Sequence, residues 1–323
     1  MTQRIWIPEI PQIRALGARV LAAGVARLGS FRVPRDGDRG LCGAPAPFAT
    51  RVIDGVTLAY NDEGQGTVVV CLHALGHGAR DYARLRRRLR GHFRVIALDF
   101  PGHGRSSDDA KAPSISRYTQ LLAGLLDALA IERAILVGNS MGGGVAIRYA
   151  AMNPERVSAL VLANPAGLEP QDRIAGAAIG AMVKLFLAGA AKAEWFPLAF
   201  DTYYRMVLPG AAARAARARI VATAVELAPI LARAWKSFAD PGEDLRGLVS
   251  KIRVPVLFTW AKHDRFIQLW RTRPAIARFP DARVETFSAG HSPQLETPDA
   301  FEQVVWMFLG DLENVSQYER SAS

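Results

Sequence analysis

Hydrophobic positions change their spacing several times along this chain, and the changes predict the order of its helices and strands. From Arg51 onward, short continuous apolar runs alternate with segments of helical periodicity. The apolar runs are 67–75, 93–100, 134–137 and 157–163, and the helical segments are 82–89, 115–130 and 144–152. Residues 52–60 alternate around Asp54-Gly55, which is typical of a hairpin. This order predicts an α/β fold with a mostly parallel sheet covered by helices on both faces.

The alternation stops after Asn164-Pro165-Ala166-Gly167. Residues 168–250 are rich in Ala and Leu, have helical periodicity and contain no convincing strand. Strand patterns resume at 254–260 and 282–287, and a final helix is predicted over 298–312. The simplest interpretation is one α/β core, a helical cap inserted into it and a short C-terminal tail. The core is formed by residues 51–167 and 251–315, the cap by 168–250 and the tail by 316–323.

The first fifty residues follow a different pattern. Pro8 and Pro11 interrupt their start, residues 13–28 predict one helix, and residues 32–47 are rich in Gly, Pro and Arg, as linkers are. The apolar run 20–26 is short and ends at Arg27, which is not typical of a signal peptide. We expect residues 1–50 to be an extension that packs on the body of the molecule, with peripheral contact to a membrane as the alternative. No stretch reads as long and apolar enough to span a bilayer.

The composition of the chain bears on which partners the protein binds and in which compartment it works. The chain has 323 residues, half of them hydrophobic, which is enough to bury a large core. Its net charge is +10, but many arginines stand singly among alanines instead of forming one basic face. We therefore expect a solvated basic surface and no nucleic-acid partner. There are two cysteines, and Cys71 lies in an apolar run, so no disulfide framework is predicted and a cytoplasmic location fits.

The sequence Gly138-Asn139-Ser140-Met141-Gly142-Gly143 lies between an apolar strand and a helical pattern. A G-x-S-x-G in this context is a nucleophile elbow, which lifts the serine hydroxyl clear of the sheet. Side chains at Gly138 and Gly142 would collide in so sharp a turn. Glycine-rich turns also occur in nucleotide-binding folds, so the motif alone leaves a structural turn as the alternative.

A serine nucleophile needs a base, and the base needs a group that orients it. Among six histidines, His291 follows the last predicted strand, and Asp264 follows the strand before it. The order Ser140, Asp264, His291 along the chain is the one expected for this kind of site. Taken singly, His291 reads as a surface-loop residue and Asp264 as a helix cap. His263 is the alternative base, but its neighbour is the orienting residue itself.

Acyl transfer also needs backbone N–H groups that hold the oxyanion. One donor should be the residue after the nucleophile, Met141. The other should come from the loop after the strand that ends near His73, and its position indicates Leu75.

With these motifs in place, residues 51–312 resemble the α/β-hydrolase superfamily. The resemblance rests on His73 to Gly76, on Asp99 to Ser106, on the elbow, on Asp264, and on Gly290 to Glu296. It implies a Ser140 nucleophile, a His291 base and an Asp264 orienter, with no metal or cofactor. It also implies that His103, in the Asp99 to Ser106 loop, is structural. Relatives usually carry His-Gly where this chain has His73-Ala74, and alanine restricts the turn if that position needs a positive φ.

A serine at the elbow argues against haloalkane dehalogenases and epoxide hydrolases, which place an aspartate there. The motifs look like those of carboxylesterases and lipases, and also like those of carbon–carbon hydrolases that cleave ring-fission products. Ser292 stands where the second group commonly has an aromatic residue, so we expect an esterase that takes a small apolar ester. The alternatives are a carbon–carbon hydrolase, a perhydrolase or acyltransferase, and a ligand-binding protein on the same fold.

Two sets of residues in the cap bear on the substrate. An apolar set could line an acyl pocket or form the core of the cap itself: Met182, Leu185, Phe186, Leu187, Trp195, Phe196, Leu198 and Phe200. A basic set could meet a substrate carboxylate or form a solvated helix face: Arg205, Arg214, Arg217 and Arg219.

Overall fold

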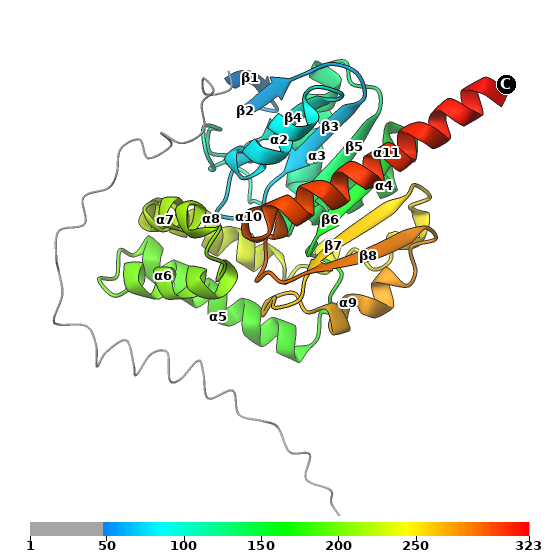
Figure 1. Cartoon of the computed structure of the whole chain (residues 1–323). Helices are drawn as coiled ribbons and strands as arrows, with labels where there is room; N and C mark the ends of the chain where they lie inside the picture. Colours follow the sequence, from blue (N-terminus) through cyan, green and yellow to red (C-terminus); the bar gives the residue numbers. More distant parts are fainter. Residues whose placement is uncertain (1–47, 323) are drawn as a thin grey trace, which may run out of the picture.

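The computed structural model describes residues 48–322, with side chains as far as Leu312 (Figure 1). The predicted extension and linker therefore lie almost entirely outside the described residues. The first strand begins at Phe48, inside the segment assigned to that extension.

A single sheet organises the described part of the chain. Its eight strands lie in the order β1-β2-β4-β3-β5-β6-β7-β8. Strand β2 pairs antiparallel with β1 and β4, and every later pair is parallel. The strands are β1 (Phe48–Ile53), β2 (Val56–Glu63), β3 (Val68–Leu72), β4 (Arg94–Leu98), β5 (Ala134–Asn139), β6 (Val157–Ala163), β7 (Val256–Ala261) and β8 (Ala282–Phe287). The predicted α/β fold is confirmed.

The predicted hairpin joins β1 to β2. Asp54 and Gly55 both have positive φ, 48° and 79°, which suits a two-residue turn whose twist matches that of the strands. Ile53 pairs directly with Val56 across this turn.

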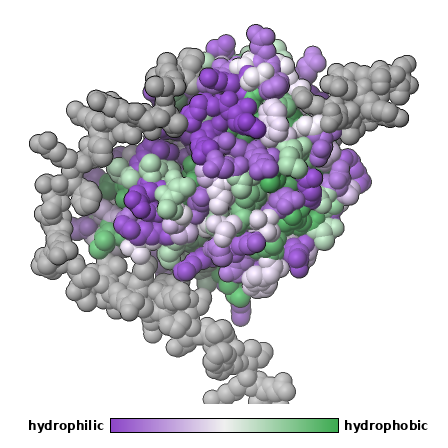
Figure 2. Space-filling model, viewed as in Figure 1, coloured by the Kyte–Doolittle hydropathy of each residue, from purple (hydrophilic) through white to green (hydrophobic). Residues whose placement is uncertain are grey.

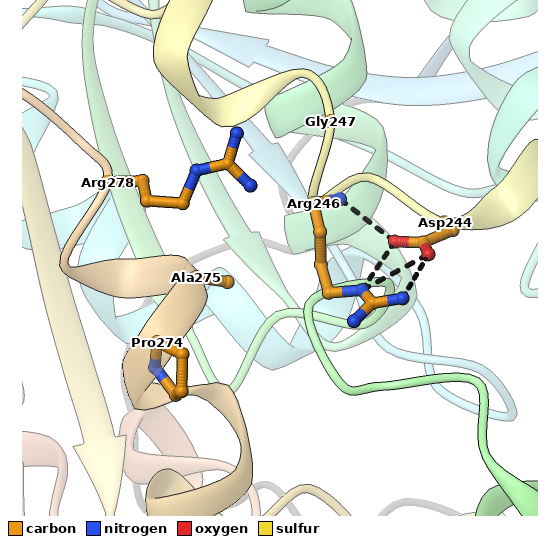
Figure 3. A pocket seen from close by; sticks show the side chains of 6 residues that line it. All are labelled: Asp244, Arg246, Gly247, Pro274, Ala275 and Arg278. Carbon is orange, nitrogen blue, oxygen red and sulfur yellow. Dashed lines mark hydrogen bonds and ion pairs between the residues drawn. The ribbon is translucent and has the colours of Figure 1, made fainter.

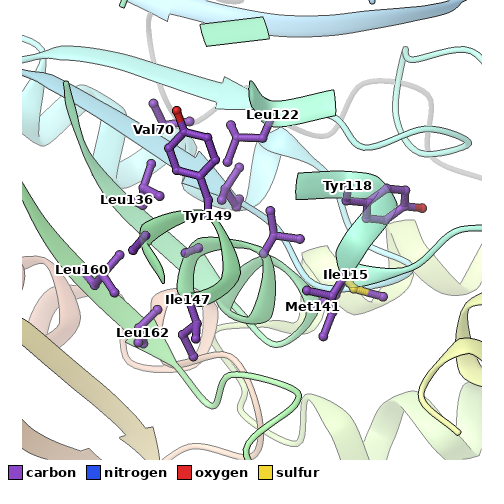
Figure 4. Packing of buried hydrophobic residues seen from close by; sticks show 14 of the residues in the cluster. Val70, Ile115, Tyr118, Leu122, Leu136, Met141, Ile147, Tyr149, Leu160 and Leu162 are labelled. Atoms are coloured by element: carbon purple, nitrogen blue, oxygen red, sulfur yellow. The ribbon is translucent and has the colours of Figure 1, made fainter. Parts of the chain in front are cut away.

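The central strands are buried on both faces because their side chains alternate between two cores. Val70, Leu136 and Leu160 point to one face, where α3 (Ile115–Ala128) and α4 (Met141–Met152) cover them (Figure 4). The alternate residues Cys71 and Val137 point to the other face. There they meet side chains of α2 (Ala83–Leu89) and α11 (Pro298–Ala322). Strand residues that are apolar at every position follow from this double burial.

Between β6 and β7 the chain forms a helical insertion, which we define as residues 168–250. Its helices are α5 (Arg173–Ala190), α6 (Phe196–Val207), α7 (Arg214–Val221) and α8 (Ala224–Ser237). Two short 3-10 segments, η3 (Pro241–Glu243) and η4 (Val249–Lys251), lead back to the sheet. The insertion has its own apolar cluster, which packs against Leu75, Phe266 and Leu295 of the core. Figure 1 shows its helices beside the ends of the strands, away from β1.

The apolar set divides in the structure. Phe186, Phe196 and Phe200 are fully buried in the insertion's own cluster, so they form the core of the cap and do not line an acyl pocket. Leu187 and Trp195 are 54% and 46% exposed, so they face outward. Leu198 is exposed as well.

Two predictions from the sequence are wrong: the end of the last helix, and the absence of a helix long and apolar enough to span a bilayer. Helix α11 continues to Ala322, so the predicted tail is helical over most of its length. Helix α5 is also long and apolar enough to cross a membrane by length and composition, with a mean hydropathy of 1.5. Much of that apolar character comes from alanine, which is less apolar than Leu or Ile and is spread among glycines, so no long run of large apolar residues marks the helix in the sequence.

The remaining helices of the core are short. They are η1 (Ala79–Tyr82), η2 (Pro154–Arg156), α9 (Leu269–Ile276) and α10 (Pro293–Glu296). On the face of the molecule that Figures 1 and 2 share, hydrophilic residues gather over the upper part, where Figure 1 places the arginine-rich α2.

Candidate active site

Ser140 occupies a strained turn between β5 and α4. Its φ is 53° and its ψ is −116°, a backbone conformation that non-glycine residues rarely adopt. The turn is tight enough to exclude side chains on either side. A Cβ on Gly138 would overlap the carbonyl group of Gly142, and a Cβ on Gly142 would overlap the carbonyl oxygen of Leu72. Both glycines are therefore required for the reason that the sequence predicts.

The loop after β6 holds the strained turn in place. The N–H of Ser140 donates to the carbonyl of Ala163 at 2.9 Å. The carbonyl of Ser140 accepts from Ala166 N–H and Gly144 N–H, each at 3.0 Å. The serine backbone is thus bonded on both sides, while its side chain is left half-exposed.

Asp264 and His291 meet at the carboxyl ends of β7 and β8. Nδ1 of His291 lies 2.6 Å from Oδ2 of Asp264, and both residues are buried. Oδ2 also accepts from the amide of Asn164 at 2.7 Å, and Oδ1 accepts from the N–H groups of Phe266 and Ile267. These donors stabilise the ionised carboxylate and fix the direction in which it faces.

The pair changes the basicity of the imidazole. Burial alone would lower the pKa of His291, but the Asp264 carboxylate outweighs it and raises the pKa above its ordinary value. His263 does not take this role. Its ring is exposed, and its Nε2 lies 3.3 Å from the hydroxyl of Ser288.

A second buried carboxylate shapes the loop that carries His291. Oε1 of Glu296 accepts from the N–H groups of Gly290, His291 and Ser292 at 2.9–3.1 Å. Its Oε2 accepts from the N–H of Gly210, in the helical insertion, at 3.1 Å. One side chain therefore holds the histidine loop and ties it to the insertion.

Asn139 joins this loop to the elbow. Its amide nitrogen donates to the carbonyl of His291 at 3.1 Å, and its Oδ1 accepts from Ser292 and Gln294. The roles of Asn139, Asn164 and Glu296 are not predicted by the sequence motifs. A usable signal was present for the asparagines, since each lies at or just past the carboxyl end of a buried strand.

The loop after β3 is fixed from both sides. The N–H of Gly76 donates to Nε2 of His103 at 2.9 Å, and the carbonyl of Leu75 accepts from the hydroxyl of Tyr204 at 3.3 Å. Tyr204 belongs to α6 of the insertion. Among the described residues, the N–H groups of Leu75 and Met141 find no protein acceptor.

His73 and His103 are structural, as the resemblance implies for His103. Nδ1 of each ring faces a backbone carbonyl, that of Ala74 or Pro101, and Nε2 accepts from the N–H of Phe100 or Gly76. Burial lowers the pKa of His73 to about 4 and that of His103 to about 3. Both rings are therefore neutral, as their acceptor role requires.

Ala74 does not strain this loop. Positive φ falls on Gly76, at 76°, and not on Ala74. The departure from His-Gly is therefore accommodated, because an alanine adopts the conformation found here without cost.

Three of the four arginines that could meet a substrate carboxylate have protein partners. Arg205 bonds to Asp201 at 2.8 Å, Arg217 donates to the carbonyl of Leu208, and Arg219 bonds to Asp81 at 3.2 Å. Arg214 is exposed at the start of α7.

Away from this site, the described residues form a second surface feature but no cluster of metal ligands. Within residues 48–312, no group of three or more His, Cys, Asp or Glu side chains is placed to hold a metal ion. A surface cavity of about 350 Å³ lies between α9 and the chain that returns from the insertion. Figure 3 shows Arg278 on one side of it and the Asp244–Arg246 ion pair on the other. None of the predicted site residues lines this cavity.

Comparison with known proteins agrees with the geometry. The model of the alpha/beta hydrolase family matches residues 69–304. The chain belongs to this family. Among sequence relatives, the 2-hydroxy-6-oxo-6-phenylhexa-2,4-dienoate hydrolase of Burkholderia cepacia is 30% identical over 261 residues, which cover 78% of this chain and 90% of that protein.

Solved structures of family members superpose on the same region. A thermophilic esterase from Thermogutta terrifontis matches with a TM-score of 0.72 at 20% identity, over 83% of this chain and 99% of that one. The enol-lactonase from Burkholderia xenovorans LB400 matches with a TM-score of 0.68 at 25% identity, over 82% of this chain and 100% of that one. The first likeness shows the fold alone. Together, the family match and the relatives make this alpha/beta hydrolase family member a hydrolase.

Proposed function

We propose that this hydrolase cleaves carboxylic esters of apolar acyl or alkyl groups, with Ser140, His291 and Asp264 as a catalytic triad. The observation that carries the proposal is the buried His291–Asp264 hydrogen bond of 2.6 Å. Its histidine loop is bonded, through Asn139, to the turn that presents Ser140. A nucleophile, a base and an orienting carboxylate are the parts that acyl transfer needs.

The reaction would proceed in two steps. Nε2 of His291 takes the proton of Ser140 as the serine oxygen bonds to the ester carbonyl carbon. The tetrahedral intermediate collapses, and the alcohol leaves with the proton from His291. Water, deprotonated by His291, then attacks the acyl-enzyme, and the carboxylic acid leaves as Ser140 regains its proton. Asp264 keeps the imidazole in the required tautomer and stabilises its charged form.

The N–H groups of Leu75 and Met141 would hold the oxyanion. Neither has a protein acceptor within the described residues. Met141 directly follows Ser140 in the elbow, and Gly142 of the elbow lies against the carbonyls of Leu72 and His73, just before Leu75. The Met141 donor lies at the N-terminus of α4, where the partial positive charge of the helix favours a developing anion. The geometry of the Leu75 loop, fixed by His103 and Tyr204, supports this assignment.

The helical insertion would act as a cap over an apolar pocket. Its cluster packs directly against Leu75, the predicted donor itself, and against Phe266, whose N–H donates to the orienting carboxylate. Because Arg205, Arg217 and Arg219 have protein partners, the insertion offers a substrate carboxylate little pairing from these side chains. An uncharged ester therefore fits this surface better than a ring-fission product that carries a carboxylate.

The second candidate is hydrolysis of a carbon–carbon bond in a ring-fission dienoate. It is favoured by the relatives at about 30% identity that carry that name. The same serine, histidine and aspartate would serve it. The two candidates differ in the substrate and in the bond that breaks, so substrate profiling separates them.

The decisive experiment compares wild type with Ser140→Ala on p-nitrophenyl esters from acetate to palmitate, and on a ring-fission dienoate. Ser288→Ala, at an exposed serine, is the matched control. We expect ester turnover that disappears only in Ser140→Ala, together with labelling of Ser140 by a fluorophosphonate. Turnover of the dienoate without ester turnover would select the second candidate. Ester turnover that survives in Ser140→Ala would refute the proposed nucleophile.

A further inference from the structure

The outer side of the helical insertion exposes an unusual concentration of large apolar side chains. Of the nine exposed large hydrophobic residues among those the structure describes, four fall within the segment 174–198. They are Ile174, Leu187, Trp195 and Leu198, with exposed fractions of 65%, 54%, 46% and 48%. Scattered exposed apolar residues need no explanation, but a cluster in one segment indicates an interaction surface.

Helix α5 provides two of these four residues, Ile174 and Leu187. Only 11% of its 18 residues are buried within the described structure, although its mean hydropathy is 1.5. Phe186 and Gly189 are its buried residues, and Gly189 packs against the ring of Phe196. One edge of the helix thus binds the insertion, and the opposite edge is left open. Figure 1 shows α5 at the lower border of the molecule, where no other described element covers it.

Basic residues predominate on this surface, and its two acidic residues, Asp172 and Glu194, stand at the ends of the segment. Arg173, Lys184 and Lys192 are exposed, and no acidic residue occurs from Arg173 to Ala193. The next acidic residue, Glu194, stands beside Trp195. The whole chain carries a net charge of +10, which adds a long-range attraction toward anionic surfaces.

We propose that the open face of α5, with Trp195 and Leu198, docks on an anionic lipid–water interface. The free energy falls when exposed apolar groups leave water and enter the boundary between lipid headgroups and acyl chains. Tryptophan favours that boundary because its ring is apolar and its N–H is polar. Lysine stems lie along apolar surface while their ammonium groups reach lipid phosphates. The helix lies flat on the lipid and does not cross it, because its inner edge remains packed on the insertion.

A lipid surface fits better than a second protein chain. A protein partner would have to present acidic groups at positions that match these cations, whereas anionic lipids supply negative charge wherever the cations lie. The proposal does not depend on the proposed reaction, because binding to vesicles is measured without turnover.

The test is co-sedimentation of the full chain with vesicles of phosphatidylcholine, with and without phosphatidylglycerol. We expect binding to the anionic vesicles that weakens as salt is added. The double variant Leu187→Ala/Trp195→Ala should weaken binding on the order of a hundredfold, since two large side chains no longer enter the interface. Lys184→Gln should weaken binding about fivefold.

Trp270→Ala is the matched control, because Trp270 is 69% exposed but lies on α9. Its binding should equal that of wild type, and all variants should turn over a soluble substrate as wild type does. Absence of vesicle binding by wild type, or equal binding by the double variant, would overturn the proposal. A dimer in analytical ultracentrifugation that the double variant abolishes would overturn it as well, since the face would then join two copies of the chain.

Discussion

The two halves of the candidate site use histidine in opposite ways. On one side, after β3 and β4, the rings of His73 and His103 bond only to backbone groups, and burial lowers their pKa values to about 4 and about 3. On the other side, after β7 and β8, the Asp264 carboxylate raises the pKa of His291 although that ring is buried as well. Among these three buried rings, the partner and not burial separates the structural histidines from the candidate base.

The halves also differ in how the helical insertion holds them. The hydroxyl of Tyr204 reaches the carbonyl of Leu75 on the first side. The N–H of Gly210 reaches the carboxylate of Glu296 on the second. The insertion therefore contacts both the loop of the proposed oxyanion donor and the loop of the proposed base. The contrast predicts which changes will affect chemistry and which will affect stability.

The largest effect is expected when the base loses its carboxylate. Asp264→Asn should lower kcat by about 10³–10⁴-fold, because the imidazole is no longer held in the required tautomer. Asp281→Asn, at an exposed acid near β8, should leave kcat unchanged. Steady-state kinetics on the best ester checks both, and a loss of less than tenfold would contradict the assigned role.

The pH dependence of Asp264→Asn tests whether the carboxylate, and not burial, sets the pKa of His291. His291 must be neutral to accept a proton, so wild-type kcat/KM should fall as pH drops through a pKa above 6.5. Without the Asp264 charge, burial outweighs the smaller opposing effect of Glu296 and lowers that pKa. The acid limb of Asp264→Asn should therefore move to lower pH, and an unmoved limb would show that another group titrates.

A smaller effect is expected when the histidine loop loses its anchor. In Glu296→Gln the amide presents hydrogens toward N–H groups that formerly donated to a carboxylate. We expect the free energy of unfolding to fall on the order of 3 kcal/mol, with a lower kcat as the loop loosens. Glu285→Gln, on β8 with a side chain that is 46% exposed, should be neutral. Urea unfolding measures the first effect, and equal stability of the two variants would refute it.

The neutral histidines should make the protein sensitive to acid. When unfolded, His73 and His103 bind protons near pH 6.5, but when folded they do so only near pH 4 and 3. The unfolded state therefore gains protons first, and stability is lost as pH falls below 6.5. Between pH 6.5 and 5 each ring should contribute a loss on the order of 2 kcal/mol.

Unfolding curves at the two pH values test this expectation. His103→Asn should lose less stability on acidification than wild type does, whereas His263→Asn, at an exposed ring, should behave as wild type. Identical acid dependence in all three proteins would contradict the structural role of His103.

The smallest effect is expected from the contact between the insertion and the Leu75 loop. Tyr204→Phe removes one neutral hydrogen bond, so kcat/KM should fall about two- to tenfold. Tyr149→Phe is the matched control, because the buried hydroxyl of Tyr149 has no partner among the described residues. A change in kcat/KM for Tyr149→Phe as large as that for Tyr204→Phe would show that the effect is not local.

Much of the fold could be predicted because the pattern is redundant. Strand β6 and strand β8 have the bounds that the apolar runs predict, and the Asp54-Gly55 turn is where the hairpin signal places it. Boundaries governed by end effects were less predictable. The apolar pattern predicts a helix that begins at Gly144, but α4 begins at Met141, because the strained Ser140 is the residue directly before the first helical turn.

The site was predictable only where a motif names a residue type at a strand end. Glu296 illustrates the limit: it is five residues from His291, but nothing in the local pattern shows that its carboxylate turns back onto three N–H groups of that loop. Its bond to Gly210, 86 residues away in the chain, is decided by how the insertion docks.

The sequence by itself determined the parallel sheet, the serine turn with its two glycines, and the order of Ser140, Asp264 and His291. These features depend on local backbone geometry and on apolar periodicity, which act over a few residues. The tertiary structure decided that His291 is the histidine that pairs with the Asp264 carboxylate. It also decided that the positive φ falls on Gly76 and not on Ala74, and that Leu187 and Trp195 face outward and not into a pocket. Those outcomes depend on which groups are brought together and which are left to solvent, and only packing of distant segments fixes that.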